Sequence, residues 1–236
     1  YIVKFNIKLV IIIMIIKFRF IILFLLGCIF CFPSIVSASS GFSISRIHYG
    51  GGGDWYSDKT SLPNLLEFLS NNTSIITNLE ENVVKIGDKN FYSNSYFYIT
   101  GHGNIKLSDE EIIILREHLI NGAFLHADDN YGMDPSFRNL VSQMFPNREL
   151  VEIPPGHDLF NIHYKFENGL PKIHEHDNKR PQALGIFHDQ RLVLLYTYES
   201  DLGDGWESQK VHNNPEGLRE EALKMGTNII VYSLLQ

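Results

Sequence analysis

Polar side chains that could act as acids, bases or metal ligands stand just after four apolar runs of this sequence. They are Asp54, His102, Asp128, Asp129 and His157. Because the carboxyl ends of parallel strands share one edge of a sheet, we expect these side chains to converge in one cleft. Two imidazoles and several carboxylates could bind a divalent metal ion there or act as an acid–base pair. The alternative is that His102 and Asp128 only cap helices and complete turns.

The first of these runs leads into a loop of four glycines and two aromatic residues, Gly50–Tyr56. Bare backbone N–H groups at Gly51 and Gly52 could cradle a phosphate or a sugar. The run matches no phosphate-loop or dinucleotide-binding motif, however, so a lid or a tight turn is the favoured interpretation. Trp55 and Tyr56 could stack on a sugar ring or a partner chain, or simply cover the sheet edge.

Two further polar segments lie in the C-terminal third. The alternating side chains of His174–Asp177 could hold a metal ion, but a solvated loop is favoured because no apolar anchor is evident around them. The acidic residues of the segment 201–207 lack the 1-3-5 spacing of a calcium loop, so we expect a turn. Trp206 is interpreted as a wall of the pocket.

The sequence offers few nucleophiles. It contains neither a Gly-x-Ser-x-Gly nor a Ser-x-x-Lys motif, and both cysteines, Cys28 and Cys31, lie in the first forty residues. The run Phe97–Gly103 is similar to the histidine strand of caspase-like proteases. The place of their catalytic cysteine reads His126-Ala-Asp-Asp129 here, which argues against a cysteine protease.

Residues 1–38 are predicted to be a targeting segment. Lys17 and Arg19 precede an apolar run, Phe20–Phe32, and Val-Ser-Ala at 36–38 fits a signal-peptide cleavage site. Residues 1–13 could be upstream sequence translated by mistake. We expect an exported protein, in the periplasm or cell envelope, that contacts a membrane only through this segment.

Two alternatives to cleavage remain open. Leu9–Phe32 is long enough for an uncleaved membrane anchor, and Cys28 could carry a lipid. The whole chain carries a net charge of −7, and the only charged residues before Ser39 are basic, so the rest is more acidic still. An acidic surface repels phosphate backbones, so a nucleic-acid partner is not expected.

Residues 42–235 are predicted to form one α/β domain. Helices are expected behind Pro63, from the Ser108 capping box to Ile120, after Asp134 and after Asn214. Strands are expected at 42–49, 83–86, 96–100, 123–127, 150–153, 162–166, 183–187 and 192–198, and 227–235 fits a helix or a strand. The alternation predicts a mostly parallel sheet with helices on both faces, and antiparallel strands at an edge after residue 154.

Several spaced motifs of the domain resemble one bacterial family, domain of unknown function 4159. The motifs are Tyr49-Gly-Gly-Gly-Gly-Asp-Trp-Tyr, Thr100-Gly-His-Gly, Asp128-Asp-x-Tyr-Gly, Pro154-Pro-Gly-His-Asp, Asp201-Leu-Gly-Asp-Gly-Trp-Glu and Met225-Gly-Thr-Asn-Ile-Ile-Val-Tyr. The resemblance implies a flavodoxin-like fold similar to class I glutamine amidotransferases, often within larger envelope proteins. It implies no established activity, and the amidotransferase cysteine is missing.

Two functions are consistent with these observations. The first is a non-catalytic domain that binds a small polar ligand, a glycan or an envelope protein through Gly51, Gly52, Asp54, Trp55, Tyr56 and Trp206. The second is a hydrolase in which His102, Asp128, Asp129 and His157 act as metal ligands or as an acid–base pair. No organic cofactor is expected in either case.

Overall fold

The computed structural model describes residues 41–176 and 178–236. The predicted targeting segment, with its cleavage and lipid-attachment candidates, and Asp177 lie outside the described residues. Within the described residues, no helix combines the length and the apolar character needed to cross a membrane.

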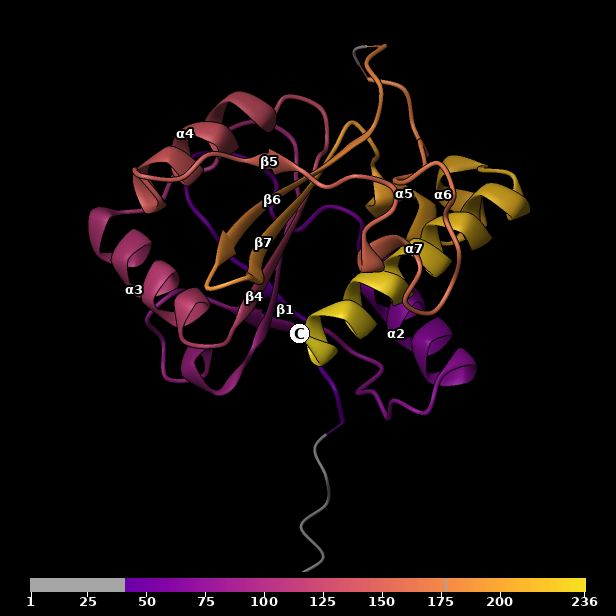
Figure 1. Ribbon diagram of the computed structural model, residues 1–236, viewed down its shortest axis with the longest axis horizontal. Coiled ribbons are helices and arrows are strands. Elements are labelled where there is room, and N and C mark those ends of the chain that lie inside the picture. Colours follow the sequence, from indigo (N-terminus) through magenta and orange to yellow (C-terminus); the bar gives the residue numbers. More distant parts are fainter. Residues whose placement is uncertain (1–40, 177) are drawn as a thin grey trace, which may run out of the picture. The chain divides into compact units, whose positions relative to one another are not determined.

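The centre of the domain is a seven-stranded sheet (Figure 1). Its strands are β1 (Ser45–Ile47), β2 (Asn82–Val84), β3 (Tyr96–Ile99), β4 (Phe124–Asp128), β5 (Val151–Glu152), β6 (Gln182–His188) and β7 (Arg191–Tyr198). The spatial order is β2-β1-β3-β4-β7-β6-β5, with parallel pairing from β2 to β7 and antiparallel pairing from β7 to β5. The first five positions have the flavodoxin-like order, which confirms the predicted fold class.

Helices cover both faces of the sheet. They are α2 (Ser61–Asn72), α3 (Asp109–Ile120), α4 (Asp134–Met144), α5 (Leu202–Trp206), α6 (Gln209–His212) and α7 (Glu216–Leu235). Figure 1 shows α3 and α4 on one face, and α2, α5 and α7 on the other. Each face buries its own apolar cluster, one beneath α3 and α4 and one beneath α2 and α7.

The predicted capping box at the start of α3 is present. The Ser108 hydroxyl accepts a hydrogen bond from the backbone N–H of Glu111, and the Glu111 carboxylate accepts one from the backbone N–H of Ser108. The expected caps of the next two long helices are shifted. Asp134 is the first residue of α4, and Asn214 donates to the Asp204 carbonyl while Pro215 precedes α7.

The strand expected at 192–198 is present, and it lies in the interior of the sheet and not at its edge. Strand β7 lies between β4 and β6, and all of its residues except Arg191 are buried. Strands covered on both faces carry continuous apolar runs, and Leu192–Tyr196 is such a run. The central position of β7 places its carboxyl end beside that of β4, with Asp128 paired to Thr197.

One other expectation differs from the structure, and one choice that the sequence left open has an answer. Residues 162–166 form no strand, and both backbone groups of Tyr164 bond the side chain of Asn228, the N–H at 2.7 Å and the carbonyl at 2.7 Å. Residues 227–235 continue helix α7, and its Ile229 and Ile230 are buried in the apolar cluster beneath α2 and α7. Burial of that apolar face outweighs the weak helix propensity of β-branched residues.

Candidate functional site

Strand β4 ends in a buried carboxylate that connects it to the start of helix α5. Asp128 is 0% exposed, and its Oδ2 accepts a hydrogen bond of 2.6 Å from the Gly203 N–H. Its Oδ1 accepts bonds from the Leu202 N–H at 3.2 Å and from the Thr197 hydroxyl. Burial, followed by the nearby Asp201 carboxylate, raises the pKa of Asp128 to about 8. Through these hydrogen bonds, Asp128 fixes the end of strand β7 and the start of helix α5 against strand β4.

The turn after β7 brings another carboxylate to the same edge. Glu199 and Asp201 both have left-handed backbone conformations, with φ of 56° and 57°. Such conformations cost roughly 1 kcal/mol or more for residues other than glycine and persist only when neighbours hold them. Here the Asp129 carboxylate accepts a 3.0 Å hydrogen bond from the Glu199 N–H. The turn presents Asp201, 2% exposed, as the N-cap of α5.

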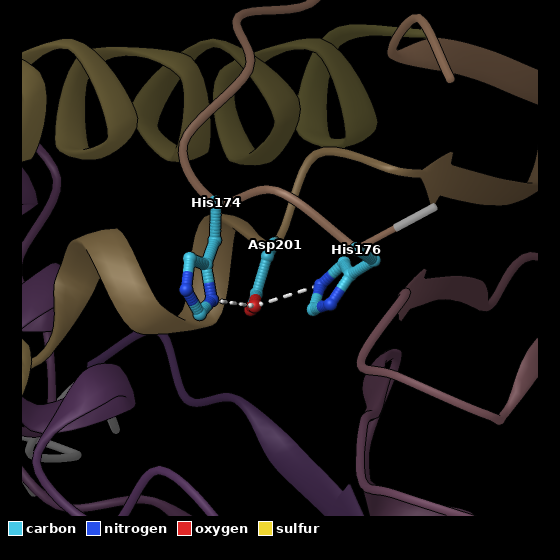
Figure 2. A group of neighbouring side chains, drawn as sticks. All are labelled: His174, His176 and Asp201. Atoms are coloured by element: carbon cyan, nitrogen blue, oxygen red, sulfur yellow. Dashed lines mark ion pairs between the residues drawn. The ribbon is translucent and has the colours of Figure 1, made fainter. Parts of the chain in front are cut away.

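Two histidines from the β5–β6 connection converge on Asp201 (Figure 2). His174 Nδ1 lies 3.4 Å from Asp201 Oδ2, and His176 Nε2 lies 3.0 Å from the same oxygen. The backbone N–H groups of Ile173 and His174 both bond the Ser200 carbonyl, which fixes this segment against the turn. The solvated loop expected from the sequence is therefore not found at His176, whose side chain is only 8% exposed.

The three donor atoms of His174, His176 and Asp201, hereafter the first donor set, are arranged as metal ligands would be. All lie within 4.8 Å of one another. Ligand atoms around a tetrahedral zinc ion with bonds near 2 Å are roughly 3.3 Å apart, close to the two distances above. His176 Nε2 is buried, and the contact it makes is the ion pair with Asp201 Oδ2. In the deprotonated imidazole, the lone pair on that nitrogen could bind an ion shared with this carboxylate.

A second group lies next to the first. Asp58, Asp204 and His212, hereafter the second donor set, also have donor atoms within 4.8 Å of one another. His212 Nε2 lies 3.1 Å from Asp204 Oδ1 and 2.9 Å from Glu207 Oε2. The elements that supply this set are the loop after β1, helix α5 and the end of helix α6.

The electrostatic environment of these groups favours a cation. Burial is the main cause that raises the pKa of Asp58 to about 6 and that of Asp204 to about 9. Of the neighbouring charged groups, the Asp201 carboxylate raises both pKa values the most. Although burial acts in the opposite direction, His174 and His176 hold the pKa of Asp201 below its ordinary value. In the described part of the chain, no lysine or arginine forms an ion pair with any of these three aspartates.

An open cleft of about 260 Å³ lies beside the first donor set. Its lining includes Asp129, Tyr131, His176 and Tyr198, and the Tyr131 ring stacks on His176 with 6.0 Å between ring centroids. Burial raises the pKa of Asp129 to about 6. The cleft could therefore admit a small polar ligand to within reach of His176.

Asp54 and His102 meet at the same edge, but as a separate pair. His102 Nδ1 lies 3.1 Å from Asp54 Oδ2, and 54% of the His102 side chain is exposed. Among the described residues, no hydrogen bond or ion pair joins His102 to Asp128 or Asp129. The predicted convergence is thus partial, with two carboxylate–imidazole groups in place of one.

The glycine loop is held by main-chain pairing. The N–H groups of Gly50 and Gly53 bond the carbonyls of Lys106 and Asn104, at 3.2 and 3.0 Å, so these two donors are already used. Gly51, with φ of 105°, packs against Lys106, and Gly52 lies in open space. This arrangement agrees with a tight turn. Beyond it, Trp55 stacks on His48 and Tyr56 is 56% exposed.

Two other candidates lie away from this edge. The His157 ring packs against Tyr232 and Phe187, with centroid distances of 5.3 and 6.3 Å, and Phe187 pairs with Leu192 at the start of β7. That point is five strand residues, roughly 16 Å, from Thr197 near the carboxyl end of β7. The chain after β5 turns back over helix α7, so His157 lies far from the edge that carries Asp128. Trp206 is fully buried, and its indole N–H bonds the Ala222 carbonyl at 2.8 Å. It is a core residue of helix α5 and not a pocket wall.

Sequence reasoning gave too little weight to the histidines of the β5–β6 connection. A signal was present, since Leu170 and Ile173 precede His174 and both are buried in the core beneath α2 and α7. The residues of the second donor set were either not singled out or interpreted as a turn. Asp58 and His212 are about 150 residues apart, so no local spacing could indicate that they meet.

Comparison with known proteins gives one family. The family model described as "Domain of unknown function (DUF4159)" matches residues 43–234. No curated protein matches the chain.

Proposed function

The chain belongs to this family of unknown function, and we propose from its own geometry that it binds a divalent transition-metal ion through the first donor set. The ion would hold a small polar ligand in the adjacent cleft. The observation that carries this proposal is the convergence of two imidazole nitrogens on one buried carboxylate (Figure 2). Two histidines and one aspartate suit Zn²⁺, Fe²⁺ or Mn²⁺ better than Ca²⁺ or Mg²⁺.

Burial strengthens this inference. Asp201 and the His176 side chain are almost inaccessible to solvent, so water cannot screen their charges well. A buried carboxylate next to Asp204 and Asp58 experiences like-charge repulsion, which a divalent ion would reverse. The cleft then supplies the access route that a ligand needs.

The test is metal binding to chelator-stripped protein, measured by calorimetric titration with Zn²⁺ and by elemental analysis. The variants His174→Ala and His176→Ala should lose Zn²⁺ binding by about 100-fold or more, since even partners outside the coordination shell are worth about 10–100-fold. At a free Zn²⁺ concentration of 100 Kd, bound ion should stabilise the wild type by about 2.7 kcal/mol.

His102→Ala is the matched control. Its side chain is 54% exposed, like that of His174, and it also lies against an aspartate at the same sheet edge. This variant should bind Zn²⁺ as the wild type does. Wild-type protein that binds no ion, or that loses binding only with His102→Ala, would contradict the proposal.

A specific observation favours a second function, metal-assisted hydrolysis. Asp129 lines the cleft with His176, so its carboxylate is placed to orient or deprotonate a water beside a bound ion. An Asp129→Asn variant should then keep its Zn²⁺ and lose hydrolysis of p-nitrophenyl ester or phosphoester probes. Probe hydrolysis that is equal in both proteins would exclude this role.

The N-terminal sequence supports export as the cellular context of this function. Its basic start, apolar run and small residues at 36–38 are typical of a signal peptide. Cleavage after Ala38 would give a mature N-terminus at Ser39 in protein recovered from the periplasm or medium. Full-length protein in the membrane fraction would instead support the anchor.

A further inference from the structure

Asp204 lies between the two donor sets, with one carboxylate oxygen facing each. Its Oδ2 is 3.1 Å from His174 Nδ1, and its Oδ1 is 3.1 Å from His212 Nε2. A carboxylate with this disposition can bridge two cations, each oxygen binding one. Asp204 is 6% exposed, and its place in helix α5 directly after the Asp201 turn fixes where both oxygens point.

The second donor set is held rigidly on its outer side. Glu207 Oε1 accepts hydrogen bonds of 3.2 Å from both the N–H and the hydroxyl of Thr60, which leaves Oε2 for His212. The carbonyl of Asp58 accepts bonds from Arg46 and from Ser61, so the loop after β1 is tied to the sheet and to helix α2. These contacts hold a group of carboxylates around one imidazole.

One buried atom beside the second donor set has acceptor capacity that the protein does not use. Asn130 is 1% exposed, and its amide N–H donates to Asp58 Oδ2 at 3.1 Å, while its Oδ1 accepts no hydrogen bond. Buried polar atoms without partners are rare in native proteins, and a bound ion or an ordered water is a usual explanation.

The excess of buried carboxylates over cationic side chains near the two donor sets also favours bound cations. Asp58, Asp128, Asp201, Asp204 and Glu207 are all buried. The guanidinium of Arg46 donates to three backbone carbonyls and to Glu81, and that of Arg219 donates to the Glu207 carbonyl and to the Glu216 carboxylate. One divalent ion at the first donor set would compensate Asp201 and part of Asp204. Among the described residues, Glu207 would then have only the His212 imidazole as an ion-pair partner, and Asp58 would have none.

We propose that the site is dinuclear, with a second divalent cation bound by Asp58, Asp204 and His212, and with Asp204 bridging the two ions. This inference rests on the proposed function, because it requires the first ion. Two-metal sites bind both the attacking and the leaving oxygen in displacement at phosphorus or carbonyl carbon. The substrate class that such a centre fits is an oxyanion, such as a phosphoester, presented through the cleft at His176.

The test counts ions and detects their coupling. Chelator-stripped protein is loaded with Mn²⁺, the bound ions are counted by elemental analysis, and the electron paramagnetic resonance spectrum is recorded. Wild-type protein should bind two ions and give an exchange-coupled multiline spectrum. His212→Ala should bind one ion and give the six-line spectrum of isolated Mn²⁺. The His212 side chain is 31% exposed, so this variant should keep its fold, which circular dichroism can check.

The results separate the two proposals. One ion in the wild type, unchanged in His212→Ala and lost in His176→Ala, would overturn the second site and leave the first intact. No ion in any of these proteins would overturn both. Asp204→Asn adds an independent check, because loss of the bridge should weaken both ions and abolish the coupled spectrum. Two uncoupled ions in the wild type would refute the bridge.

Discussion

Replacing Gly205 by alanine is expected to push helix α5 away from helix α7 and to disturb the proposed metal site. A β-carbon at this position would overlap with Cβ of Ala222 and lie 2.9 Å from Cγ2 of Ile173. Non-bonded carbon atoms prefer about 3.5–4.0 Å, so the Ile173 methyl must retreat by roughly 0.6 Å. Gly205 directly follows Asp204, and Ile173 directly precedes His174. Ligands of both donor sets therefore lie beside the overlap.

The magnitude follows from two opposing effects. Overpacking a filled core costs about 1–3 kcal/mol, while alanine gains up to about 1 kcal/mol over glycine in a helix. We expect Gly205→Ala to lower the free energy of unfolding by about 1–2 kcal/mol, measured by urea denaturation. Zn²⁺ binding should weaken in the same variant.

Two further variants separate steric overlap from helix propensity. Gly217→Ala on helix α7 adds a β-carbon with no atom within 4 Å, so it should be neutral or stabilise by up to about 1 kcal/mol. Ala222→Gly removes the atom that Gly205→Ala meets, so a double-mutant cycle should give a coupling energy of about 1 kcal/mol or more. Additive effects, or a Gly205→Ala as stable as Gly217→Ala, would refute the close packing.

Three other substitutions test the elements that hold the edge. Asp128→Asn should lower the free energy of unfolding by about 2 kcal/mol in urea, because its NH₂ group must face donors that include the N–H groups of Leu202 and Gly203. Burial lowers the pKa of His126 from 6.5 to about 3, so the unfolded chain binds a proton that the native state does not. Stability should therefore fall by up to about 1.4 kcal/mol per pH unit from pH 6.5 towards 3, and the difference between wild type and His126→Phe in urea titrations at each pH should show this slope. Arg46→Lys cannot replace the guanidinium bonds to three carbonyls of the loop after β1, so it should cost about 2–3 kcal/mol and speed proteolysis of that loop; unchanged cleavage would contradict this.

The parallel half of the fold could be predicted from local patterns. Apolar runs ending in small or acidic residues identified β3 and β4, and the Ser108–Glu111 capping box identified the start of helix α3. The antiparallel half could not be predicted as well. Residues 162–166 have the composition of a strand, but the side chain of Asn228 occupies the backbone groups that a neighbouring strand would need.

The candidate site was only partly visible in the sequence for a topological reason. Asp128 and Asp129 lie at the strand end where they were expected. The main donors, His174 and His176, come from a connection that returns to the edge, and long-range contacts such as those with Ser200 and Glu199 fix that return. His157, which follows the predicted strand 150–153, does not join the site. The strand before it, β5, has only two residues and lies at the margin of the sheet, so it does not direct His157 to this edge. The expected similarity to class I glutamine amidotransferases stays a prediction.

The nitrogen and oxygen donors of the first donor set lie on different segments of the chain. Asp201 and Asp204 lie on a turn and helix that directly continue the central strand β7, whereas His174 and His176 lie on the connection from 153 to 181. If that connection lifted away, Asp201 and the second donor set would remain, which together offer one imidazole and several carboxylates, a harder donor set suited to Mg²⁺ or Ca²⁺. Under the proposed function, ion selectivity would therefore depend on the position of one segment, and a protease cut within 153–181 should shift preference from Zn²⁺ towards Mg²⁺.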